Sequence, residues 1–100
     1  MNRLIEQFLD YLALERGLRE NTTEAYGNDL ESFNTFLLRQ KIATFNDATR
    51  KDILHFLMEE KERGLATSTL SRRLVAIKVF YRYLVQEGLI SENITEAMDS

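Results

Sequence analysis

The side chains best suited to chemistry in this chain are the small hydroxyl and basic residues between residues 63 and 86. The stretch has five basic residues and no acidic one: Arg63, Arg72, Arg73, Lys78 and Arg82. Near its start it adds the hydroxyl residues Thr67, Ser68, Thr69 and Ser71. Hydroxyl and backbone N–H groups at a helix start donate hydrogen bonds to phosphate oxygens, and an arginine one turn further along can reach a phosphate or a guanine edge. The pattern predicts a helix that can enter a DNA groove.

Helical periodicity divides this stretch into two faces. At about 100° per residue, one arc collects Leu70, Leu74, Ile77, Tyr81 and Leu84, and we expect this arc to face the core. The opposite arc holds Ser68, Ser71, Arg72, Val75 and Val79, with Lys78 and Arg82 beside it.

Three other interpretations of this helix stay open. Basic side chains on an outer face are commonly a solvent coat. Val75 and Val79, together with the short C-terminal segment, could instead dock on another protein, which would make the chain a helical interaction module. A helix-turn-helix repressor is less favoured, because Gly64-Leu65-Ala66 could form its turn but the next helix is long and no dimerisation element is apparent.

Four main helices with short connections must position these side chains. Apolar residues at helical spacing predict helices at about residues 2–16, 21–40, 49–63 and 67–87. Ile42 and Phe45 are expected to anchor the loop of residues 41–48, which is the longest of the connections and is called the long loop. Glycines follow three of these helices and can end them: Gly17, Gly64 and Gly88. Side-chain caps are expected at Asn21 or Thr22, at Thr49, and at Thr67 or Ser68. A short fifth helix is expected from Ser91 or Asn93 to Met98. The fold class is all-α.

Composition and charge limit the classes of protein that fit. The chain has 100 residues, 44% of them hydrophobic, which suits one domain with one core. A formal charge of −3 argues against binding polyanions through bulk charge alone. With no cysteine and one histidine, we expect no metal site and no cofactor. We see no signal-peptide pattern and no apolar run of about 20 residues, so we expect a cytoplasmic protein without a membrane partner.

Catalysis by this chain is not expected. It has no Ser/His/Asp set, no glycine-rich phosphate loop and no H-E-x-x-H motif. His55 lies among apolar neighbours and is expected to be a partly buried structural residue. The tyrosines at positions 11, 26, 81 and 83 fall on or beside apolar stripes and are expected to pack. Residues 59–63 form a charge run that we expect to be a solvated face.

Several short motifs occur along the chain in a fixed order. The first spans Ile5 to Leu12 and continues with Glu15-Arg16-Gly17-Leu18. The second is Asn21-Thr22-Thr23 with Ala25-Tyr26 and Asp29-Leu30, and the third is Thr49-Arg50-Lys51-Asp52-Ile53. The fourth runs from Ala66 to Leu84 and includes Ser71-Arg72-Arg73-Leu74 and Phe80-Tyr81-Arg82-Tyr83-Leu84. Together they resemble the tyrosine recombinase (phage integrase) family, closest to its Xer-like branch, over nearly the whole chain.

The resemblance implies that residues 1–100 form a single core-binding domain, a SAM-like bundle that makes one jaw of a clamp around double-stranded DNA. In the family, DNA strands are cut and rejoined by a separate catalytic domain, which we expect to be absent from this chain. The matching positions that would face DNA are Thr22, Thr23, Ala25, Ser68, Thr69, Arg72, Arg73 and Lys78. Other recombinase protomers on the same DNA are the expected protein partners, and the isolated domain is expected to be a monomer.

Two positions depart from the family pattern. Gly27-Asn28 stands where a basic pair often follows the tyrosine of the second helix, which predicts a weaker DNA contact from that helix. Asn93-Ile94 stands where Asn-Pro is frequent, which leaves the path of the last segment open.

Overall fold

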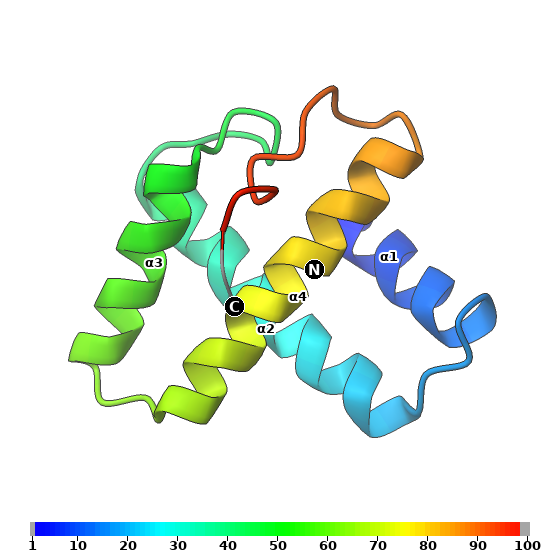
Figure 1. The fold of residues 1–100 in the computed structure, drawn as a ribbon, viewed down its shortest axis with the longest axis horizontal. Coiled ribbons are helices and arrows are strands. Elements are labelled where there is room, and N and C mark those ends of the chain that lie inside the picture. Colours follow the sequence, from blue (N-terminus) through cyan, green and yellow to red (C-terminus); the bar gives the residue numbers. More distant parts are fainter. Residues whose placement is uncertain (1, 99–100) are drawn as a thin grey trace.

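Four helices make up the fold in the computed structural model, which describes residues 2–98. They are α1 (Arg3–Leu14), α2 (Glu20–Arg39), α3 (Arg50–Glu62) and α4 (Thr67–Gln86). In Figure 1, α4 crosses in front of α2, with α1 and α3 on either side. No strand occurs among the described residues. The all-α prediction with four main helices is therefore confirmed.

Local signals in the sequence set several of the helix ends. Asn2 caps α1, its side-chain oxygen accepting from the Leu4 N–H at 2.8 Å. At Thr49, the predicted cap of α3 is present as a capping box with Asp52. Gly64 ends α3 with φ 92°, a left-handed conformation that favours glycine. In this turn the Leu65 N–H donates to the Glu60 carbonyl at 3.2 Å, which is the 6→1 hydrogen bond of a Schellman motif.

Two of the predicted caps are wrong. The cap position of α2 is Arg19 and that of α4 is Ala66, and neither has a side-chain cap hydrogen bond. The backbone of both residues is extended, with ψ 153° and 151°, so helical geometry begins directly after them. Asn21, Thr22, Thr67 and Ser68 consequently lie inside the first turn of their helices, where they cannot act as N-caps.

The predicted fifth helix is also wrong, because residues 91–98 form a series of turns. The side-chain oxygen of Asn93 accepts hydrogen bonds from both the N–H (2.9 Å) and the hydroxyl (2.6 Å) of Thr95. Such local side-chain bonding offers the backbone an alternative to a helix. Thr95 is buried, and Ile94 and Met98 pack against the core. The segment is thus held by its own turns and by apolar anchors.

A single hydrophobic core lies where the helices meet. Its largest fully buried side chains are Ile5, Phe8, Leu12, Leu30, Phe33, Leu37, Ile53, Phe56, Ile77, Phe80, Tyr81 and Leu84. The predicted core stripe of α4 is confirmed from Leu74 onward, whereas Leu70 is half-buried. Ala76, Phe80 and Tyr83 are buried too, because α1, α2 and α3 all contact α4. A helix packed on several sides needs apolar residues beyond one stripe.

Phe45 and Ile42 join the long loop to this core, as the sequence predicted. Phe45 is buried and Ile42 packs against the cluster. Tyr81 ties the same loop to α4, its hydroxyl donating to the Phe45 carbonyl at 2.6 Å. Burial, together with the charge of Asp52, raises the pKa of Tyr81 far above its ordinary value.

Alkaline pH is expected to destabilise the fold through Tyr81. The unfolded chain releases this proton near its ordinary pKa of about 10, whereas the folded chain retains it. The contribution to stability is therefore complete below about pH 10 and decreases as the pH rises further. In Tyr81→Phe this decrease should be shallower, and stability near pH 7 should fall by about 1 kcal/mol through loss of the hydrogen bond. Urea unfolding followed by circular dichroism across this pH range measures both effects, and identical pH dependence in the two proteins would contradict the assignment.

Candidate functional site

The predicted contact residues lie in the first two turns of α2 and α4, except Lys78, which lies near the middle of α4. Both helix starts are on the lower side of the bundle in the view of Figure 1. On α2, Thr22 is exposed, whereas Thr23 and Ala25 are half-buried. On α4, Ser68 is exposed and Thr69 is half-buried. One of these hydroxyls already has a partner, since Thr23 donates to the Arg19 carbonyl at 3.1 Å.

Arg72 joins α4 to α2 through a bidentate ion pair with Asp29. Its Nε and Nη2 atoms lie 2.9 and 2.8 Å from the two carboxylate oxygens. The Asp29 side chain is wholly buried, whereas that of Arg72 is 44% exposed. Donating these hydrogen bonds to the Asp29 carboxylate raises the pKa of Arg72, which secures its positive charge. Asp29 thus holds one edge of the guanidinium inside the bundle.

Arg73 points toward α3 and is 14% exposed. Its Nη1 donates to Glu60 at 2.9 Å, while its Nε lies 3.8 Å from Asp29 and has no hydrogen-bond partner. The guanidinium also lies over the Phe56 ring, 5.9 Å from the centroid. Arg72 and Arg73 are therefore neighbours in sequence that tie α4 to two different helices.

Glu60 corrects the prediction that residues 59–63 form a solvated face. Its side chain is 6% exposed and accepts from both Arg73 and, at 3.4 Å, Arg63. Glu59 does lie at the surface, where it pairs with Arg39 of α2. This pairing lowers the pKa of Glu59 and raises that of Arg39. His55, expected to be partly buried, is exposed on α3.

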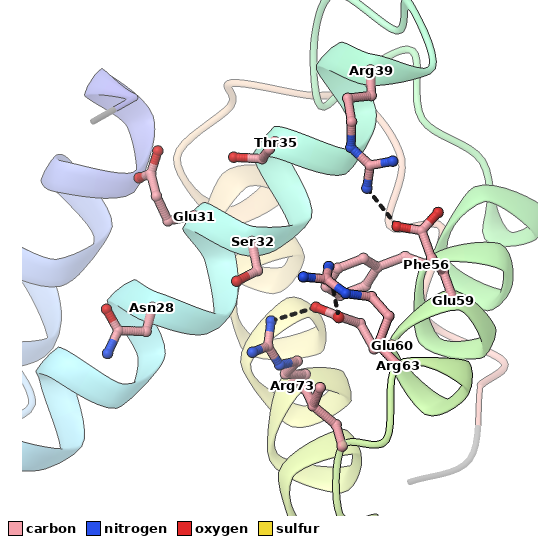
Figure 2. A pocket seen from close by; sticks show the side chains of 11 residues that line it. Asn28, Glu31, Ser32, Thr35, Arg39, Phe56, Glu59, Glu60, Arg63 and Arg73 are labelled. Carbon is pink, nitrogen blue, oxygen red and sulfur yellow. Dashed lines mark hydrogen bonds and ion pairs between the residues drawn. The ribbon is translucent and has the colours of Figure 1, made fainter.

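A cleft of about 840 Å³ opens between α2, α3 and the start of α4. Figure 2 shows three arginines in it, Arg39, Arg63 and Arg73, each bonded to a glutamate. Its α2 wall carries Asn28, Glu31, Ser32 and Thr35. Positive and negative groups alternate across the cleft and largely cancel, so it does not present one sign of charge to a ligand.

Lys78 holds the last described segment against α4. Its Nζ donates to the Met98 carbonyl at 2.7 Å. In Figure 1 this segment returns from the end of α4 across the bundle. Lys78 is half-buried, and Arg82, one turn further on, is exposed. The predicted DNA contact of Lys78 stays a prediction, and the structure adds an intramolecular role for it.

At Gly27, where the sequence departs from the family pattern, α2 packs closely against α1. A Cβ atom at this position would lie 3.1 Å from Leu9 Cδ1 of α1, closer than carbon atoms normally approach. Gly27 is buried and Asn28 is exposed. A larger side chain at position 27 would require the Leu9 side chain to shift by a few tenths of an ångström, so glycine suits this close contact.

Sequence reasoning missed Asp29 and Glu60, although the spacing contained the signal. Asp29 falls three residues after Tyr26 and four before Phe33, on the apolar stripe of α2. Glu60 likewise follows Ile53 and Phe56 by seven and four residues on α3. An acidic side chain on an apolar stripe is buried when the helix packs, and a buried acid needs a basic partner. The basic residues of α4 could supply that partner.

The four tyrosines are packing residues. Tyr81 and Tyr83 are buried, and burial raises the pKa of both. Tyr11 and Tyr26 pack against the core. Residues 2–98 contain no cluster of three or more acidic, histidine or cysteine side chains that could hold a metal ion. None of the helices in this part of the chain is long and apolar enough to cross a membrane.

Comparison with known proteins agrees with this architecture. Residues 5–88 match the family described as "Phage integrase, N-terminal SAM-like domain". The chain is 44% identical over all 100 residues to a protein named tyrosine recombinase XerC from Herpetosiphon aurantiacus, and 42% identical over the same length to one from Roseiflexus castenholzii. A relative of the same name from Listeria monocytogenes is 40% identical over 91 residues.

The chain spans about a third of the length of these relatives: 33%, 32% and 30%. No solved structure matches it significantly. The family match covers more than four-fifths of the chain and includes all of α2, α3 and α4. The four-helix bundle fits a SAM-like domain. The chain belongs to the family of phage integrase N-terminal SAM-like domains, and its relatives are tyrosine recombinases.

Proposed function

We propose that this chain is the DNA-binding domain of a site-specific tyrosine recombinase and forms one side of a clamp around duplex DNA. Strand cleavage and rejoining would then belong to another domain of the parent protein, and further protomers on the same DNA would be its partners. The observation that carries the proposal is the start of α4, where Ser68 and Thr69 lie one turn before the exposed guanidinium of Arg72. Hydroxyls, helix-start N–H groups and an arginine are the donors that DNA backbones and bases accept.

The proposed contact set is smaller than the sequence suggested. It consists of Thr22, Thr23, Ala25, Ser68, Thr69 and Arg72. Arg73 is largely buried against Glu60 and Phe56, so we propose that it ties α4 to α3 and does not contact DNA. Lys78 already donates to Met98, so we propose that it acts by positioning the last segment.

We expect weak DNA binding with a shallow salt dependence. Most of the proposed contacts are uncharged, and Asp29 offsets the charge of Arg72. With about one phosphate neutralised, affinity for a duplex of about 30 base pairs should fall only roughly three- to fourfold between about 50 and 200 mM salt. Fluorescence anisotropy measures this dependence. Arg16→Ala, an exposed arginine beyond α1, is the control and should bind unchanged.

A chemical-shift titration locates the contact. Shifts gathered at residues 20–25 and 67–72 would support the proposal. A folded chain that shows no shift at these positions with any duplex at low salt would refute it.

The alternative is a helical protein-interaction module. Val75 and Val79, the side chains first considered for such a surface, are half-buried, and Val79 packs on the core. Exposed apolar side chains lie instead on α3, where Leu54 and Met58 are one turn apart and 47% and 59% exposed. Shifts confined to α3 that grow with protein concentration would favour this alternative.

A further inference from the structure

We propose that Asp29 is a positioning residue, which holds the Arg72 guanidinium so that its opposite edge faces a DNA phosphate or base. This inference rests on the proposed function. A guanidinium carries five N–H donors in one plane. Asp29 accepts from Nε and Nη2 at 2.9 and 2.8 Å. The hydrogen bonds described among residues 2–98 do not use Nη1, and the Arg72 side chain as a whole is 44% exposed, which leaves the edge around Nη1 for a ligand.

Arg72 has to act from the place where Asp29 holds it. If the Arg72 side chain moved away from Asp29, a buried carboxylate would be left without its partner, which is strongly destabilising. Arg73 cannot replace the lost bonds as it stands, because its Nε lies 3.8 Å from Asp29, beyond hydrogen-bond distance. The Arg72 side chain therefore meets DNA with its conformation already fixed. Fixing a flexible side chain in advance lowers the entropy cost of binding.

The pair also joins the two helices that carry the proposed contacts. Ala25 precedes Asp29 by one turn of α2, and Ser68 precedes Arg72 by one turn of α4. The bidentate ion pair between Asp29 and Arg72 sets the separation and the angle between the starts of α2 and α4. Asp29 thus positions a side chain and, through it, the surface around that side chain.

Two roles for Asp29 predict opposite effects of Asp29→Asn on DNA binding. If the carboxylate merely offsets positive charge, its removal should tighten binding to a polyanion. If it positions Arg72, its removal should weaken binding, because an amide oxygen replaces only one of the two acceptors. The sign of the change therefore separates the two roles.

The experiment compares four proteins on a mixed-sequence duplex of about 30 base pairs at about 50 mM salt. They are the wild-type chain, Asp29→Asn, Arg72→Lys and Glu60→Gln, each shown by circular dichroism to be folded at the temperature used. Arg72→Lys keeps the charge but cannot form the two parallel bonds. Glu60→Gln is the matched control, since it removes the same charge from a buried carboxylate that binds the neighbouring Arg73.

We expect the Kd to rise roughly tenfold or more in Asp29→Asn and Arg72→Lys, and to stay the same or fall in Glu60→Gln. Unchanged or tighter binding by Asp29→Asn would overturn the inference. So would an equal loss in Asp29→Asn and Glu60→Gln, because general damage to the bundle would then suffice. If Asp29→Asn does not fold, Asp29→Glu decides the question, because it keeps the charge but moves the carboxylate: weaker binding supports the inference and unchanged binding overturns it. A folded wild type that binds no duplex would instead refute the proposed function.

Discussion

Replacing Phe80 by alanine is expected to cost about 3–5 kcal/mol of unfolding free energy. Phe80 is completely buried, and its ring contacts Phe8, Phe45 and Tyr81 at centroid distances of 5.2, 4.8 and 6.0 Å. Those three rings come from α1, the long loop and α4, so the cavity would open where three parts of the chain meet. The total free energy of unfolding of a domain of this size is about 5–15 kcal/mol.

Urea unfolding followed by circular dichroism measures this loss. Leu14→Ala is the control, because Leu14 is 83% exposed at the end of α1 and should change stability little. A loss in Phe80→Ala no larger than that of the control would show that Phe80 does not join these elements.

Glu60→Leu is expected to cost about 3–5 kcal/mol, since it leaves Arg73 buried without its close carboxylate partner. The pair is 2.9 Å apart, with side chains 14% and 6% exposed. The double variant Glu60→Leu with Arg73→Met should regain most of the loss, because a buried ion pair and a well-packed apolar pair have similar stabilities.

Glu59→Gln serves as the comparison for Glu60→Leu in chemical denaturation. Glu59 pairs with Arg39 at the surface, where water screens the charges, and its replacement should have little effect. If Glu60→Leu were as well tolerated as Glu59→Gln, the buried pair would not hold α3 to α4. A double variant no more stable than Glu60→Leu would show instead that the apolar pair does not pack.

Periodicity predicted the four helices because each buries a stripe of apolar side chains at helical spacing. Glycine and Thr49 predicted helix ends well, since these signals act over a few residues. The predicted caps at Asn21 and at Thr67 or Ser68 failed because the backbone enters each helix earlier, at Arg19 and Ala66. The fifth helix failed because Asn93 bonds locally to Thr95.

The basic surface of α4 was predicted less well than its core. The stretch lacks acids along the sequence, yet Asp29 and Glu60 reach it from 43 and 13 residues away. Counting charges along one helix could not reveal partners from other helices. Arg72→Glu would accordingly place a second carboxylate beside a buried one, so loss of DNA binding in that variant would also reflect damage to the fold.

The ion pairs described among residues 2–98 link α2, α3 and α4 and leave out α1. The packing of α1 is apolar and aromatic instead, through Phe8 against Phe80 and Tyr83 and through Tyr11 against Tyr83. Hydrophobic attraction weakens on cooling. We therefore expect cooling to weaken the contacts of α1 more than the contacts among the other three helices, which ion pairs also join.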